Sequence, residues 1–196
     1  MSSPQEVEPE FLGEFKRLVA KHSVKRVVQE YLVSGIPRTM GERTYHELRA
    51  EVANQWHLHP NEIMIVGSGK LGFSIKKKRR FQSFRPDSDY DIAIISSDLF
   101  DYFWRMAFRF TPKYYDWRKK GEFQEYMVSG WMRPDMLPTE EFDDRLRWDA
   151  FFDDLSTRSK YGRHPMKAGL YKSWEHLEAY QTICVGECKS LLASSQ

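Results

Sequence analysis

Long apolar runs are absent from this sequence. The longest, such as Ile63 to Val66 and Ile92 to Ile95, are short, far below the roughly 18 to 20 residues that a membrane-spanning helix requires. The first residues, 1–6, have neither the basic region nor the apolar core of a secretory signal. We therefore expect a protein that does not enter the membrane and that resides in the cytoplasm.

The sequence also has no large excess of charge of one sign and few cysteines. Thirty Lys and Arg residues against 28 Asp and Glu residues leave a formal net charge of only +2, so the chain lacks the strong overall charge of a protein that coats nucleic acid. Its two cysteines, Cys184 and Cys188, are four residues apart in a predicted helix and have no histidines nearby. We expect reduced, packed thiols there and no metal site.

The apolar content of the chain is sufficient for one core. Hydrophobic residues make up 41% and charged residues 30% of the 196 residues, which is typical of a globular domain and excludes a disordered chain. Proline, glycine and serine occur singly without forming a linker, and no internal repeat is present. We expect one domain, with residues 1–58 helical, residues 60–172 forming the core, and residues 173–196 forming a C-terminal helix.

Hydrophobic periodicity predicts an α/β fold in which a small mixed sheet is flanked by N- and C-terminal helices. Helices are expected at about residues 11–19, 24–32, 44–56, 98–109, 140–155 and 173–192, and strands at residues 63–66, 90–96 and 166–171. In the helix at 98–109, we expect Phe100, Phe103, Trp104 and Phe108 to face inward. Residues 111–138 are aromatic and basic, and their pattern supports no assignment.

A glycine-rich turn, residues 67–72 (GSGKLG), follows the first predicted strand and has three interpretations. A Walker-type phosphate loop requires Gly-Lys-Ser/Thr and a leading glycine five residues before the glycine of that triplet. Here Leu71 follows Lys70, and Met64 takes the place of the leading glycine, so this interpretation fails.

A dinucleotide-binding turn is the second interpretation, because Gly67, Gly69 and Gly72 match G-x-G-x-x-G and an acidic residue lies about 20 positions further on. That fold needs an amphipathic helix directly after the turn, whereas residues 75–86 contain five consecutive cations and a proline. It also needs its acidic residue at the end of the second strand, not at the start.

The third interpretation rests on a strand, then Gly67-Ser68, a further glycine and hydroxyl at Gly72 and Ser74, and then Asp89-Tyr90-Asp91 opening the next strand. This pattern resembles the nucleotidyltransferase superfamily of the polymerase-β-like type, which includes small bacterial members. Residues two apart on a strand point the same way, so both carboxylates would face one side. The resemblance covers about 35 residues.

The resemblance implies a metal-dependent phosphate site. Asp89 and Asp91 would be the catalytic residues and would bind Mg²⁺ or Mn²⁺, since carboxylate oxygens are ligands that hard cations favour. Gly67, Ser68 and Ser74 would hold the phosphates of a nucleoside triphosphate, and Lys70 would add positive charge.

The chain departs from the superfamily's pattern in two respects. The spacing from Gly67 to Asp89 is long, and the excess holds a basic run, residues 76–80 (KKKRR). This run would bind substrate or an anionic acceptor such as RNA, or it is a solvated loop. Members that catalyse transfer usually contribute a third carboxylate from a later strand, but the predicted strand 166–171 has no acidic residue. Candidates elsewhere are Asp135, Asp144 and Glu175.

Two functions follow from the resemblance. The first is transfer of a nucleoside monophosphate from a triphosphate to a hydroxyl acceptor, on RNA or protein, with release of pyrophosphate. The second is a catalytically inactive module that binds nucleotide or a protein partner, for example in a toxin–antitoxin or phage-defence system. A third carboxylate near the Asp pair favours the enzyme, and its absence favours the module. The sequence does not determine the base, the acceptor or the oligomeric state.

Overall fold

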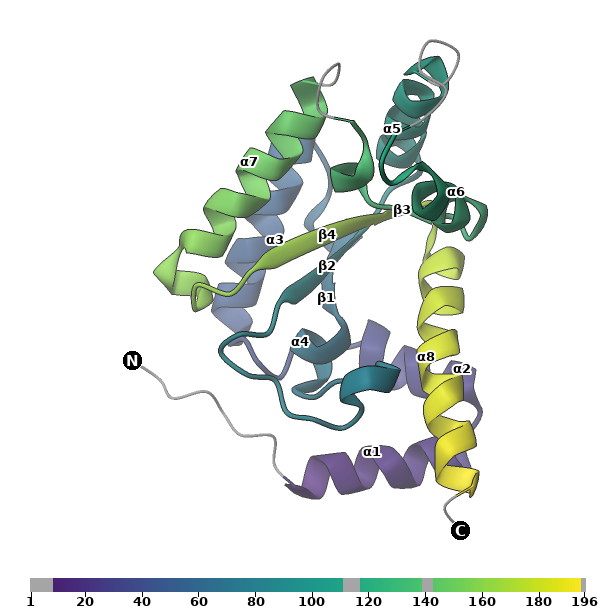
Figure 1. Ribbon diagram of the computed structural model, residues 1–196. Helices are drawn as coiled ribbons and strands as arrows, with labels where there is room; N and C mark the ends of the chain where they lie inside the picture. Colours follow the sequence, from purple (N-terminus) through teal and green to yellow (C-terminus); the bar gives the residue numbers. More distant parts are fainter. Residues whose placement is uncertain (1–8, 111–116, 139–142, 195–196) are drawn as a thin grey trace.

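A computed structural model describes residues 9–110, 117–138 and 143–194 as an α/β fold around a four-stranded mixed sheet (Figure 1). The strand order is β1 (Ile63–Val66), β2 (Tyr90–Ile95), β4 (Met166–Tyr171) and β3 (Trp131–Met132). Strands β2 and β4 are parallel, whereas the β1–β2 and β3–β4 pairs are antiparallel. The expected fold class is confirmed, and the antiparallel β1–β2 pair excludes the parallel βαβ unit of a dinucleotide-binding turn.

Helices cover both faces of this sheet. They are α1 (Pro9–Lys21), α2 (Val24–Val27), the π-helical turn η1 (Val28–Val33), α3 (Glu42–Trp56), α4 (Gly67–Leu71), α5 (Ser97–Phe110), α6 (Lys120–Val128), α7 (Asp143–Thr157) and α8 (Trp174–Ser194). Single 3₁₀ turns lie at η2 (Pro60–Glu62), η3 (Lys77–Arg79), η4 (Pro134–Met136) and η5 (Ser159–Tyr161). The predicted helices are confirmed within the described residues, which leave out residues 140–142 of the helix expected at 140–155. Residues 111–116 of the unassigned segment also lie outside the described part.

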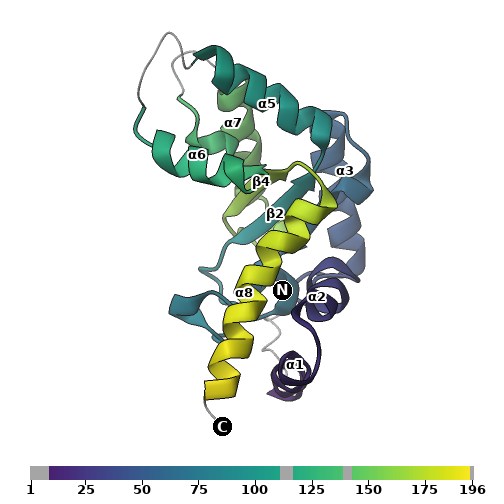
Figure 2. The same cartoon turned by 90° about the vertical axis from the view of Figure 1, so that its right-hand side faces the viewer.

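Successive side chains of each strand point to opposite faces of the sheet, so the apolar ones fall into two separate hydrophobic clusters. Ile63 and Ile65 of β1, like Ile92 and Ile94 of β2, pack in the cluster that includes α3, α5 and α7. Their strand neighbours, such as Ala93, face the opposite way and pack with Leu177 of α8. Figure 2 shows α8 crossing the sheet on this second face. The candidate site lies on the same face, because Asp91 shares the direction of Ala93.

The expectation that four aromatic residues of α5 face inward is wrong for two of them. Phe100 and Phe103 are buried, but Trp104 is 46% exposed and Phe108 is 64% exposed. The buried stripe continues through Ala107 instead, since residues three and seven positions after Phe100 lie on the same side of a helix. Trp104 and Phe108 pack against each other on the outer side, with ring centroids 6.1 Å apart.

A further cluster joins the two ends of the chain. Phe15 of α1, Val28 of η1 and Val185 of α8 are fully buried together with Phe73, which follows the glycine turn. Figure 1 shows α1 and α2 against the C-terminal half of α8. The N-terminal helices therefore help to hold α8 in place over the sheet.

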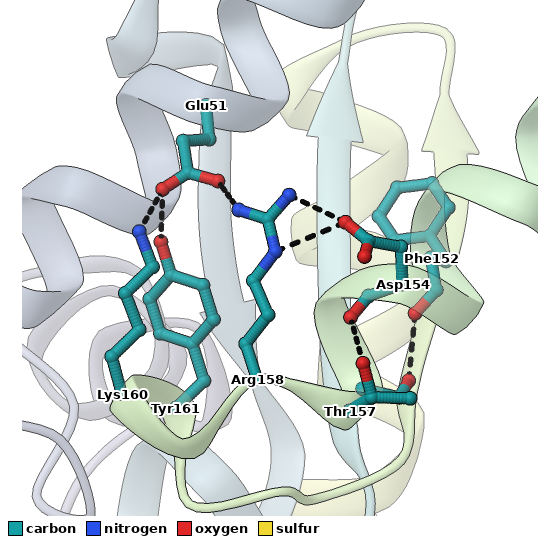
Figure 3. Close-up of polar contacts among 8 residues, drawn as sticks. Glu51, Phe152, Asp154, Thr157, Arg158, Lys160 and Tyr161 are labelled. Atoms are coloured by element: carbon teal, nitrogen blue, oxygen red, sulfur yellow. Dashed lines mark hydrogen bonds and ion pairs between the residues drawn. The ribbon is translucent and has the colours of Figure 1, made fainter.

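A polar network ties α3 to the segment after α7 (Figure 3). The Glu51 carboxylate receives hydrogen bonds from Arg158, Lys160 and the Tyr161 hydroxyl, the last at 2.8 Å. Arg158 also pairs with Asp154, one turn earlier. Since three donors converge on one carboxylate, this network fixes the chain directly before β4.

None of the helices in the described part is long and apolar enough to span a membrane.

Candidate functional site

The glycine turn forms a short helix, α4, that begins where β1 ends. Gly67 has a φ angle of +63°, which side chains rarely tolerate. A Cβ atom added at Gly67 would lie 3.0 Å from Oδ2 of Asp91. Gly72 ends the helix with a φ angle of +81°, a left-handed cap of the kind that favours glycine. Glycine at position 67 thus lets the turn approach the Asp91 carboxylate closely.

Asp89 and Asp91 lie on the same side of the chain as it enters β2, as the spacing predicts. Each carboxylate is paired with a lysine. Lys76 Nζ lies 3.2 Å from Asp91 Oδ2, and Lys167 Nζ lies 2.8 Å from Asp89 Oδ2. The two carboxylates are partly exposed, at 33% for Asp89 and 28% for Asp91. Two ammonium groups therefore lie where the resemblance implies metal ions.

Lys167 comes from β4, the strand beside β2 in the sheet. The parallel pairing places Lys167 opposite Asp91, and side chains of paired residues share one face. This later strand is where a third carboxylate is expected, and it presents a lysine there. The position of Lys167 is the main departure of this site from a transferring nucleotidyltransferase.

The three candidate third carboxylates lie elsewhere. Asp135 forms a two-pronged ion pair with Arg133 at 2.6 and 3.0 Å. Asp144 accepts a hydrogen bond from the Tyr102 hydroxyl, and Glu175 lies in the first turn of α8. None of the three lines the pocket at the Asp pair. Across the described residues, no group of three or more His, Cys, Asp or Glu side chains is placed to hold a metal ion.

The donor set fits Mg²⁺ poorly as a two-metal centre. Such a centre needs several carboxylates that bridge and surround the two ions, whereas Asp89 and Asp91 are two acids that already face two cations. An incoming divalent ion would also be repelled by Lys76 and Lys167 unless both side chains moved away. No step of a reaction is therefore derived through a metal ion.

The environment keeps these charges in place. Burial opposes ionisation of Asp89, but the hydrogen bond from Lys167 outweighs it and lowers the pKa of Asp89. Burial also opposes the charge of Lys76, but the Asp91 carboxylate outweighs it and raises the pKa of Lys76. Asp91 is placed more deeply, so burial raises its pKa, and Lys76 offsets only part of that increase. At neutral pH, Lys76 therefore remains charged.

A pocket of about 200 Å³ opens beside the Asp pair. Its polar lining consists of Gly67, Ser68, Ser74, Lys76, Asp91, Arg133, Lys167 and Gln181. Its aromatic wall consists of Tyr126, Trp131, Tyr171 and Tyr180. The rings of Tyr126 and Trp131 are stacked, with centroids 4.1 Å apart. The pocket thus combines three cations and two hydroxyls with flat aromatic surfaces.

Lys70 does not take part in this pocket, contrary to the expected phosphate contact. Its side chain is only 3% exposed, and its ammonium group donates to the backbone carbonyls of Ser34, at 2.6 Å, and of Gly35. Burial lowers the pKa of Lys70 to about 8. Lys70 therefore links the glycine turn to the N-terminal segment. The other expected phosphate ligands, Gly67, Ser68 and Ser74, do line the pocket.

Several pocket residues were not predicted from the sequence. Lys167 carried a detectable signal, because Lys167, Gly169 and Tyr171 alternate along a predicted strand and so share a face. Trp131 and Tyr126 lie in a segment without assignment, and only the packing of α6 against β3 and of β3 against β4 brings them to the site.

No family model, curated protein or solved structure matches this chain.

Proposed function

We propose that this chain is a nucleotide-binding domain with a nucleotidyltransferase-like site that holds phosphate through lysines and does not transfer the nucleotide. The position of Lys167 is the observation that supports this proposal most directly. Lys167 lies opposite Asp91 on β4 and pairs with Asp89. A basic residue at this place removes the expected third acid and supplies a counter-charge for phosphate.

The pocket has the chemistry that a nucleotide needs. Lys76, Lys167 and Arg133 line one volume, and each is paired with an aspartate. Their charge-assisted hydrogen bonds to phosphate would be about twice as strong as neutral ones. Asp89 and Asp91 hold the two lysines in place before the ligand arrives, which lowers the entropic cost of binding. In the aromatic wall, Tyr126 and Tyr180 are partly exposed, and stacking of a base on such a ring is worth about 1–3 kcal/mol.

Calorimetric titration with each of the four ribonucleoside triphosphates, in Mg²⁺ and separately in EDTA, tests this proposal. Binding is expected in both buffers. Lys167→Ala should weaken it at least tenfold, because a hydrogen bond to a charged group contributes about 1.5–3 kcal/mol and 1.4 kcal/mol is a factor of ten. Lys25→Ala, on the exposed surface of α2, is the matched control and should bind as the wild type does.

Aspartate variants separate lysine-based binding from metal-based binding. Asp89→Asn and Asp91→Asn should retain or strengthen nucleotide binding in EDTA, because each removes a negative charge beside the phosphates. Metal-dependent transfer, which the Asp pair predicts, requires the opposite: binding that is lost in EDTA and in both variants, with pyrophosphate released in Mg²⁺. That result would overturn the proposal in favour of the enzyme.

Cys184 reports occupancy of the pocket directly. It lies on α8 in the pocket lining, whereas Cys188, one turn further on, is fully buried. A bound nucleotide should slow alkylation of Cys184 by iodoacetamide, as read by mass spectrometry, while Cys188 serves as the internal control. Nucleotide binding without protection of Cys184 would place the ligand elsewhere.

A further inference from the structure

The structure divides the basic run into anchored and free parts. Lys76 reaches into the pocket and pairs with Asp91, and Arg80 pairs with Glu187 of α8 at 2.6 Å. Between them, Lys77, Lys78 and Arg79 form the 3₁₀ turn η3 and are exposed. Within the described part of the chain, none of these three side chains has a hydrogen bond or ion pair.

The basic run is held on a rigid support. Its flanks pair like a hairpin: the Ser74 amide donates to the Gln82 carbonyl at 2.9 Å, and the Phe81 amide donates to the Ser74 carbonyl at 2.7 Å. Arg80 also donates to the Ile75 carbonyl at 3.2 Å. The free cations therefore do not sit on a loose loop, and ordering them for a ligand costs little backbone entropy.

The free cations lie outside the pocket but close to it. The Arg79 amide donates to the Lys76 carbonyl at 3.0 Å, so the two residues are one 3₁₀ turn apart, a rise of about 6 Å, and their side chains start from the same side. Arg80 is anchored to Glu187, only three residues along α8 from the pocket residue Cys184. The Arg80–Glu187 pair thus holds the basic run beside α8, close to the pocket.

The size of the pocket indicates which ligand uses both parts. Its volume of about 200 Å³ is below the roughly 300–1,000 Å³ of sites that enclose a whole small molecule. A mononucleotide held by Lys76 and Lys167 would leave the three cations of η3 without a partner. A ligand that fills the pocket with one phosphate and carries further phosphates outward would use all of them.

Building on the proposed function, we propose that the natural ligand is the phosphorylated end of a single-stranded nucleic acid. Its terminal phosphate enters the pocket between Lys76 and Lys167, and the next phosphates lie over Lys77, Lys78 and Arg79. Lysine and arginine side chains are long and flexible, so the three cations of one basic turn can each contact one of the successive phosphates of a strand. A duplex end is excluded, because so small a pocket admits one strand only.

Fluorescence anisotropy in EDTA, over a series of salt concentrations, tests this inference. The probes are short labelled RNA and DNA strands of one sequence with a 5′-phosphate, a 3′-phosphate or hydroxyls at both ends. A strand with one of the two terminal phosphates should bind at least tenfold tighter than the hydroxyl-ended strand. Lys167→Ala should remove that preference, since it removes a cation that contacts the terminal phosphate.

The triple variant Lys77→Ala, Lys78→Ala and Arg79→Ala isolates the basic run. It should reduce the slope of log affinity against log salt by about 2, because each phosphate contact to a single strand contributes about 0.7. Its affinity for a mononucleotide should equal that of the wild type. The control variant removes three exposed arginines at the α5 and α6 end of the molecule (Figure 1), namely Arg105, Arg109 and Arg118, and should change neither quantity.

The outcomes distinguish the two proposals. An unchanged salt slope in the triple variant, equal binding of phosphorylated and hydroxyl-ended strands, or equal binding of duplex or polyglutamate would overturn the nucleic-acid inference while mononucleotide binding still stands. Absence of mononucleotide binding, together with loss of the terminal-phosphate preference, would overturn the proposed function itself. Circular dichroism of each variant confirms that the fold is retained.

Discussion

At the scale of single residues, Gly67 is the point on which the geometry of the site depends. Its positive φ angle turns the chain from β1 directly into α4, and its missing side chain leaves room for Asp91 Oδ2. The Asp91 carboxylate can then hold Lys76 over the pocket. A larger residue would meet both a backbone penalty and a contact with this carboxylate.

Gly67→Ala is therefore expected to lower the free energy of unfolding by about 1–2 kcal/mol, the cost of a left-handed conformation for a residue with a Cβ atom. Nucleotide affinity should fall as well, because the added methyl group distorts the turn whose residues Gly67 and Ser68 line the pocket. Urea unfolding and calorimetry measure the two effects. Gly186→Ala is the control: it lies in α8 with open space around it, so alanine should stabilise the helix by about 0.5–1 kcal/mol. Equal stability of the Gly67 variant and wild type would contradict this account.

Lys70 shows how a residue can be next to a site in sequence and still be directed away from it. Because α4 is a helix, residues two positions apart do not face each other, and Ser68 lines the pocket while Lys70 reaches the carbonyls of Ser34 and Gly35. From the sequence, Ser68 and Lys70 are both expected beside the phosphates. The helical turn was not foreseeable from so short a segment.

At the scale of elements, the Glu51 network connects α3 to the chain that leads into β4 and so to Lys167. Burial opposes ionisation of Glu51, but the hydrogen bonds from Lys160 and Tyr161 and the charge of Arg158 outweigh it, and the pKa of Glu51 is lowered. A folded-state pKa below the unfolded value of 4.5 means that the network stabilises the fold above pH 4.5. This contribution is lost as the pH falls through the folded-state pKa.

Glu51→Gln should lower the free energy of unfolding by about 1–3 kcal/mol at neutral pH, as expected for hydrogen bonds to a charged group. The difference from wild type should shrink as the pH falls below 4.5, because wild-type Glu51 is then neutral as well. Urea unfolding at neutral and acidic pH measures both. Glu47→Gln on the same helix removes only the exposed Arg43 pair and should cost less than about 0.5 kcal/mol. A constant difference at all pH values would contradict the assigned role.

The elements themselves were largely predictable from the sequence. The strands β1 and β4 begin and end at the predicted residues, and β2 ends one residue earlier than predicted, because continuous or alternating apolar residues between turn signals are a local pattern. The inward face of α5 was predicted too broadly. Aromatic content alone does not show which side of a helix meets the core, and Trp104 and Phe108 lie outside it.

At the scale of the whole molecule, α8 couples the N-terminal helices to the pocket. Its first half carries Tyr180 and Cys184 in the pocket lining, and its second half carries Val185 and Cys188 in the cluster with Phe15. The pocket wall therefore depends on packing at the far end of the same helix.

Phe15→Ala tests this coupling, because Phe15 is fully buried and such a truncation costs about 3–5 kcal/mol. Hydrogen exchange should accelerate across α1 and α8 together, and alkylation of Cys188 should become faster. Phe108→Ala is the matched control at an exposed site, with an expected change within about 0.5 kcal/mol. Faster exchange confined to α1 would show that the N-terminal helices do not support α8.

The sequence by itself determined the strands β1, β2 and β4, the glycine turn and the placement of Asp89 and Asp91 on one side, since each depends on spacings of a few residues. Only the tertiary structure decided that Lys167 lies opposite Asp91, that Lys70 faces away, and that aromatic rings from α6 and β3 wall the pocket. The pairing of Asp91 with Lys167, for example, joins residues 76 positions apart. Such arrangements depend on strand order, register and helix packing, which arise from burial of the whole core and not from any local pattern.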